Sequence, residues 1–106
     1  ADLMRIKSLQ GFDDLYTSRA HGFANALDYY QQCSSRQFLE GVQVPTLLLN
    51  ALNDSFLGPS CYPWDLCRDH PNVYFETPDF GGHVGFVDRG PFYDNERRWL
   101  EFLDAL

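Results

Sequence analysis

Apolar residues repeat at two different spacings along the chain, and each spacing predicts a different kind of element. Over residues 13–32 they recur every three or four positions, which predicts an amphipathic helix. Asp13 and Asp14 stand at its expected start, where carboxylates favour the positive end of the helix dipole. Gly22 weakens the middle of this segment, so two shorter helices also fit the pattern. The apolar stripe consists of Ala20, Phe23, Leu27 and Tyr30.

The spacing changes in the second half of the chain. The unbroken apolar run "VPTLLLNAL" at residues 44–52 is typical of a strand buried on both faces. A second strand is expected within "PNVYFETP", residues 71–78. We expect short helices over residues 33–42, where Ser34 and Gln37 have capping-box spacing and Gly41 is a stop, and over residues 61–69, with Pro63 in the first turn. A final helix over residues 91–106 carries Trp99, Phe102, Leu103 and Leu106 on one face.

The order of these elements is helices, strand, helix, strand, helix, which is the rhythm of an α/β fold with at least two parallel strands flanked by helices. Two strands do not make a stable sheet of this kind, and the few short helices cannot cover both of its faces. The sequence, which begins at Ala1 as if within a helical element, therefore reads as part of a larger domain. We expect an unpaired strand edge to be satisfied by the missing part of that domain or by a second copy of the chain.

Composition narrows the classes of partner. The chain has 106 residues, a net charge of −7 and 44% hydrophobic residues, so it is globular and acidic. An acidic surface repels phosphate backbones and anionic lipids, which argues against nucleic acid and membrane surfaces as partners. No signal peptide and no transmembrane segment is visible, and we expect a cytoplasmic protein.

Three cysteines with irregular spacing do not suggest a disulfide framework. Cys61, Cys67 and His70 could be read as a metal cluster, but a structural zinc site needs four ligands with closer cysteine spacing. Free thiols are the better interpretation, and we expect neither a metal site nor a cofactor.

Two polar residues follow the two predicted strands. Asp54 comes directly after the first strand, and His83 lies in the glycine-rich loop "DFGGHVGFVDRG" after the second. The carboxyl ends of parallel strands line one edge of the sheet, so we expect these side chains to be close enough for a hydrogen bond. An aspartate bonded to one imidazole nitrogen fixes the tautomer in which the other nitrogen can accept a proton. The pair therefore has the composition of a general base for a nucleophilic serine.

The order of the two residues matters as well. In α/β-hydrolases the triad runs nucleophile, acid, histidine along the chain, so Asp54 and His83 fit the last two members. The nucleophile would lie upstream in a Gly-x-Ser-x-Gly turn, and no serine of this chain has glycines at both flanking positions. We therefore expect the nucleophile of such a triad outside this chain.

Four motifs together resemble a known family. They are "FDDLYT" (residues 12–17), "HGFANALDYYQQCS" (21–34), "VPTLLLNALNDSF" (44–56) and "GGHVGFV" (81–87). In this order they resemble the C-terminal portion of a YheT-like α/β-hydrolase, a branch related to the eukaryotic α/β-hydrolase domain esterases and phospholipases. The resemblance implies an α/β-hydrolase fold and a serine hydrolase acting on a small-molecule or lipid carboxylic ester through an acyl-serine intermediate.

By this resemblance, Asp54 matches the acid and His83 the histidine of the triad. The family usually has two acidic residues and a proline after this strand, whereas here Asn53 precedes Asp54 and Ser55 follows it. Residues 1–43 would be lid-like helices bordering the acyl pocket, and residues 44–106 a strand–helix–strand–helix segment that carries the acid and the histidine. Phe56 and Phe86, with Phe80, are candidates for the wall of the substrate pocket.

Other interpretations stay open. Asp54 could simply cap the following turn, and His83 could be a turn residue without a catalytic role. The chain could also be a non-catalytic truncated α/β module that acts in binding or assembly. A third possibility is an α/β-hydrolase relative with an aspartate nucleophile, which would also lie upstream.

Overall fold

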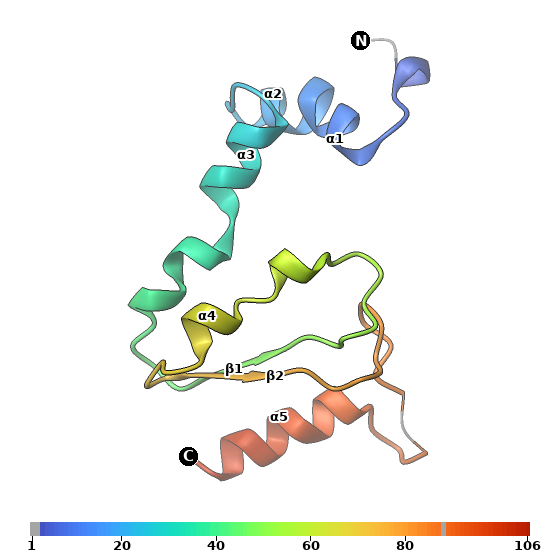
Figure 1. Ribbon diagram of the computed structural model, residues 1–106. Helices are drawn as coiled ribbons and strands as arrows, with labels where there is room; N and C mark the ends of the chain where they lie inside the picture. Colours follow the sequence, from blue (N-terminus) through green and yellow to red (C-terminus); the bar gives the residue numbers. More distant parts are fainter. Residues whose placement is uncertain (1–2, 88) are drawn as a thin grey trace. The chain divides into compact units, whose positions relative to one another are not determined.

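The computed structural model describes residues 3–87 and 89–106. These residues form two compact units, one ending at Ser35 and the other beginning at Arg36. The division by role into residues 1–43 and 44–106, which the resemblance implies, stays a prediction. Figure 1 shows both units as ribbons.

The first unit is helical, with a 3-10 turn (Leu3–Arg5) followed by two longer segments instead of one. Three short elements follow one another without a break, namely α1 (Leu9–Phe12), a π-helical turn (Asp13–Thr17) and α2 (Ser18–Ala20). After a turn at Gly22, whose φ is +81°, comes α3 (Ala26–Cys33). Asn25 caps α3 by accepting a hydrogen bond from the N–H of Asp28 at 2.9 Å. The two-helix alternative is thus confirmed, and the break lies where the sequence has glycine.

The start of the first helix was predicted four residues too late. The helix begins after Ser8, whose hydroxyl accepts a hydrogen bond from the N–H of Gly11 at 3.0 Å. Asp13 and Asp14 therefore lie in its middle, where they join the two segments. Asp14 Oδ1 accepts a hydrogen bond from the N–H of Ala26 at 2.8 Å, and Ala26 is fully buried.

A 3-10 helix (Ser35–Gly41) starts at the last residue of the first unit and continues into the second, where the capping-box pattern had predicted a short helix. Its Arg36 forms an ion pair with Asp65 at 2.8 Å. Asp65 belongs to α4 (Trp64–Cys67), which follows a 3-10 turn (Pro59–Cys61). Pro63 is the N-cap of α4. The sequence had indicated a position one step later, in the first turn of the helix.

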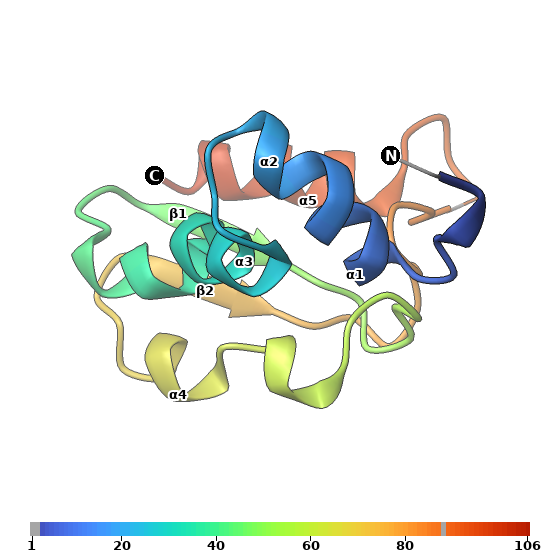
Figure 2. The same cartoon turned by 90° about the horizontal axis from the view of Figure 1, so that it is seen from above.

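The two predicted strands pair in parallel. In β1 (Thr46–Leu49) and β2 (Val73–Glu76), Thr46 pairs with Val73 and Leu49 with Glu76. Helix α4 lies on one side of this pair and α5 (Asp94–Asp104) on the other, in both views (Figures 1 and 2). The α/β fold with parallel strands flanked by helices is confirmed. Helix α5 starts three residues later than predicted.

The core of this unit is small. Its buried apolar residues are Ala51, Tyr62, Cys67, Val73 and Phe86. The strands are only half buried, and Tyr74 of β2 is 51% exposed, so the expected burial on both faces is not reached within this chain. The last helix likewise leaves much of its apolar face exposed, including Trp99 and Leu103.

Candidate active site

The loops that carry Asp54 and His83 are brought together by the parallel strands. Beyond β1 and β2 the backbone pairing continues, because the N–H of Asn50 donates to the carbonyl of Glu76 at 3.1 Å and that of Leu52 to Pro78 at 2.8 Å. The two segments that follow β1 and β2 therefore leave the sheet side by side. The loop after β1 starts directly beside the loop after β2.

Asp54 and His83 are hydrogen-bonded. His83 Nδ1 lies 2.8 Å from Asp54 Oδ2, so the two side chains meet as the positions of the strand ends predicted. The Asp54 side chain is almost completely buried, at 2% exposure, whereas that of His83 is 54% exposed. Within residues 3–87 and 89–106, Nε2 of His83 has no hydrogen-bond partner. The ring is thus anchored on one nitrogen and open on the other.

The second oxygen of Asp54 is also satisfied. Oδ1 accepts a hydrogen bond from the backbone N–H of Phe56 at 2.8 Å, so Asp54 caps its own turn as well as holding the imidazole. Burial by itself would raise the pKa of Asp54, but the hydrogen bonds from His83 and from the Phe56 N–H outweigh it and the pKa is lowered. The carboxyl group is therefore ionised and can only accept hydrogen bonds.

Two contacts fix the loop around His83. The N–H of Gly82 donates to Asn53 Oδ1 at 2.7 Å, and the N–H of Gly85 donates to the carbonyl of Gly81 at 2.8 Å. Gly81 lies against the ring of Phe86, so closely that a side chain there would overlap the ring. The glycines of the loop thus permit a tight turn over a buried aromatic ring.

The phenylalanine candidates occupy different surroundings. The ring of Phe56 packs against the imidazole of His83, with centroids 4.8 Å apart, and is itself largely exposed. Phe86 is buried beneath the histidine loop, and Phe80 is exposed. Phe56 is therefore the candidate whose ring packs on a member of the Asp54–His83 pair.

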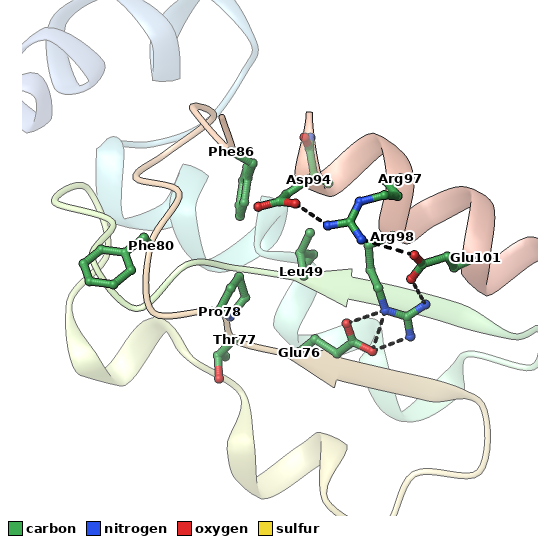
Figure 3. A pocket seen from close by; sticks show the side chains of 11 residues that line it. Leu49, Glu76, Thr77, Pro78, Phe80, Phe86, Asp94, Arg97, Arg98 and Glu101 are labelled. Carbon is green, nitrogen blue, oxygen red and sulfur yellow. Dashed lines mark hydrogen bonds and ion pairs between the residues drawn. The ribbon is translucent and has the colours of Figure 1, made fainter. Parts of the chain in front are cut away.

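An open cavity of about 470 Å³ lies near this site, between the strand ends and α5 (Figure 3). Phe80 and Phe86 line it together with a network of charged residues. Arg98 of α5 makes a two-pronged contact with Glu76 at the end of β2, with Nε 2.8 Å from Oε2. Asp54 and His83 do not line this cavity, so it is not where the pair would meet a ligand.

Sequence reasoning missed three features. The Asn53–Gly82 bond and the Glu76–Arg98 pair join residues far apart in sequence, and no periodicity marks them. His70 was considered as a metal ligand, yet its Nδ1 accepts hydrogen bonds from the two backbone N–H groups that lead into β2, both at 3.0 Å. Its position directly before Pro71 was the only available signal.

Across residues 3–87 and 89–106, no three histidine, cysteine or acidic side chains are grouped so as to hold a metal ion. No helix in these ranges has the length and apolar character needed to cross a membrane. The three cysteines are free thiols.

Sequence comparisons find relatives that share most of this chain. It is 38% identical over 101 residues to the YheT protein of Escherichia coli strain K12, a candidate esterase by its name, covering 95% of this chain and 29% of that protein. The identity is 36% over 84 residues to medium-chain fatty acid ethyl ester synthase/esterase 2 of Saccharomyces cerevisiae, covering 79% and 18%. With human phospholipase ABHD3 it is 34% over 86 residues, covering 81% and 21%.

The chain thus spans less than a third of the length of the curated relatives it matches. No protein-family model matches it, and no solved structure matches it either.

Proposed function

The chain belongs to the YheT-like α/β-hydrolases, and from this premise we propose that Asp54 and His83 are the acid and the base of a serine hydrolase that cleaves carboxylic esters. The observation that carries the proposal is the 2.8 Å hydrogen bond between a buried carboxylate and an imidazole whose other nitrogen is open. The names of the relatives support the substrate class, since they include an ester synthase/esterase, a phospholipase and a monoacylglycerol lipase.

The proposed mechanism follows from the two ring nitrogens. Nε2 of His83 takes the proton of a serine hydroxyl as the serine oxygen attacks the ester carbonyl, and then gives that proton to the departing alcohol. Nδ1–H donates to Asp54 throughout, which keeps Nε2 in the accepting tautomer and stabilises the imidazolium. Water, activated by the same nitrogen, then hydrolyses the acyl-serine. Asp54 remains ionised, in keeping with its lowered pKa.

The substrate would approach on the exposed side of His83. We place Phe56 beside the acyl or alcohol group, because its exposed ring already packs on the imidazole. Phe86 acts from beneath by supporting the histidine loop, and it reaches the adjoining cavity rather than Nε2. An apolar wall at this point would favour ester substrates with hydrocarbon chains.

The serine, the oxyanion-hole donors and further strands would come from outside these 106 residues. The half-exposed strands and the many exposed apolar side chains of the second unit support a partner that covers them, either the rest of a hydrolase domain or a second copy. The free thiols suit a reducing compartment, which we take to be the cytoplasm.

The same exposed strands favour the second candidate function, a module that acts only in binding or assembly. The two functions differ in one respect: only the hydrolase needs the Asp54–His83 bond for turnover. The test should use the full-length protein that contains this chain, so that the nucleophile is present.

We expect His83→Ala and Asp54→Asn each to lower kcat/KM for a short-chain chromogenic ester by about 100-fold to 10,000-fold. Asp69→Asn is the matched control, because Asp69 is exposed and the structure shows no hydrogen bond for its side chain. It should retain full activity. Labelling of the wild type by a fluorophosphonate identifies a serine nucleophile and separates it from an aspartate nucleophile.

Full hydrolysis by His83→Ala would reject the assigned role. Absence of both hydrolysis and labelling in the wild-type protein would favour the binding module instead.

A further inference from the structure

Asn53 holds the histidine loop beside Asp54. In the sequence, this position was notable only because the family usually has two acidic residues after this strand. From this contact we infer that Asn53 is a positioning residue, which sets the place of His83 through the backbone of Gly82. The inference rests on the proposed function for its kinetic consequence, but the contact itself can be tested without any assay of activity.

The argument starts from the order of the contacts between the two strands. Main-chain hydrogen bonds join them as far as Leu52 and Pro78, where the ladder ends. Two side chains then continue it one residue at a time: Asn53 bonds to Gly82, and Asp54 bonds to His83. These are consecutive residues on both loops. The amide therefore fixes the backbone immediately before the histidine whose ring the carboxylate holds.

The conformation of Gly82 makes this support necessary. Its φ is +54°, in a region that glycine enters at little cost. Glycine can also adopt many other conformations, so its φ alone does not hold the loop in place. No atom lies within 4 Å of the place where a Cβ would stand, so side-chain packing does not hold Gly82. The short hydrogen bond to Asn53 is the contact that selects one position for its N–H group.

The chemistry of the side chain matters as well as its reach. An amide oxygen accepts the Gly82 N–H without adding charge, whereas an aspartate at position 53 would place a second carboxylate next to Asp54. An added negative charge favours an imidazolium ion over the neutral imidazole that can act as a base. Asparagine is therefore suited to position the base without holding it in its protonated form.

The experiment compares Asn53→Ala and Asn53→Asp in the full-length protein. Removal of the acceptor should lower kcat about tenfold with little change in KM, since a displacement of about 1 Å can cost about 100-fold. Because the Asn53–Gly82 bond is exposed, water can satisfy the free N–H, and the unfolding midpoint should hardly move. Asn53→Asp should recover kcat at alkaline pH, with the acid limb of its pH–rate profile shifted to higher pH.

Asn72→Ala is the matched control, because Asn72 also bonds a backbone group through its side-chain amide, donating from Nδ2 to the carbonyl of Val42 at 3.1 Å at the opposite end of β2 from His83. It should alter stability rather than kcat. A second readout is the NMR signal of the Nδ1-bound proton of His83, in protein labelled with 15N-histidine. We expect this signal to broaden or be lost in Asn53→Ala and to return in Asn53→Asp.

An unchanged His83 signal and an unchanged kcat in Asn53→Ala would overturn the inference. Loss of the signal in Asn53→Ala would uphold the positioning role even if His83→Ala proved fully active, and in that case only the proposed catalytic function would fail.

Discussion

Gly81 is the position in the histidine loop where a single methyl group should do the most damage. A Cβ built there would lie 2.5 Å from Cδ1 of Phe86 and closer still to Cε1, whereas carbon atoms pack at about 3.5–4.0 Å. Phe86 is only 7% exposed, so its ring is confined by its neighbours. The φ of Gly81, +155°, is moreover a value that residues with side chains rarely adopt.

Both effects destabilise the folded state. Forcing extra volume into a packed site costs about 1–3 kcal/mol, and an unfavourable backbone conformation costs about 1–3 kcal/mol. We therefore expect Gly81→Ala to lower the free energy of unfolding by about 3 kcal/mol. Because His83 is two residues away, hydrolysis should fall as well.

Urea unfolding of the full-length protein measures the change, and two glycines of the same loop provide controls. Gly82→Ala meets no atom but keeps a φ of +54°, so it should cost about 1 kcal/mol. Gly85→Ala has only an ordinary contact at 3.5 Å and should stay within about 0.5 kcal/mol of the wild type. Combining Gly81→Ala with Phe86→Leu should cost less than the sum of the two, because the shorter side chain relieves the overlap. Equal stabilities for the Gly81 and Gly85 variants would refute this reasoning.

Three further predictions concern other contacts. The hydrogen bond to Asp13 raises the pKa of Tyr30 to about 12. The stability that this bond gives is therefore complete below about pH 10 and is lost as the pH rises towards 12. Alkaline unfolding of Tyr30→Phe should lack this pH-dependent loss, and an ultraviolet titration in which every tyrosine ionises at an ordinary pH would disprove the prediction. The carboxylate of Glu76 raises the pKa of Arg98. Arg98→Lys should weaken the contact between α5 and β2, because lysine cannot make the two-pronged bond. The loss of stability in urea unfolding should shrink at high salt, and a salt-independent difference from the wild type would argue against an electrostatic origin. His70→Ala leaves two backbone N–H groups without their acceptor. It should lower the free energy of unfolding, measured in urea, by about 1–2 kcal/mol. An unchanged free energy would mean that water replaces the imidazole.

The part of the site that could be predicted from the sequence is the part that topology dictates. Asp54 and His83 each follow a strand, and parallel strands deliver their carboxyl ends to one edge, so their meeting needed only the two strands to be recognised. The unbroken apolar run of β1 and the paired prolines around β2 were sufficient for that.

The remaining contacts depend on tertiary detail that carries no periodic signal. Asn53 bonds to Gly82, which lies 29 residues later in the chain. Glu76 contacts Arg98 only when α5 packs against the strands. Helix ends were misplaced for a local reason. Ser8 caps the first helix by itself, and Glu96 accepts the N–H of Tyr93 so that α5 starts after it, not at Pro91. Neither cap had been identified in the sequence.

The most direct test of the central claim is a crystal structure of the full-length protein after reaction with a fluorophosphonate. We predict that the phosphonate is bonded to a serine from outside residues 1–106, and that Nε2 of His83 lies about 2.6–3.2 Å from the oxygen of that serine. Nδ1 should still be bonded to Asp54. A labelled serine paired with a different histidine, with His83 remote from the phosphonate, would contradict the account.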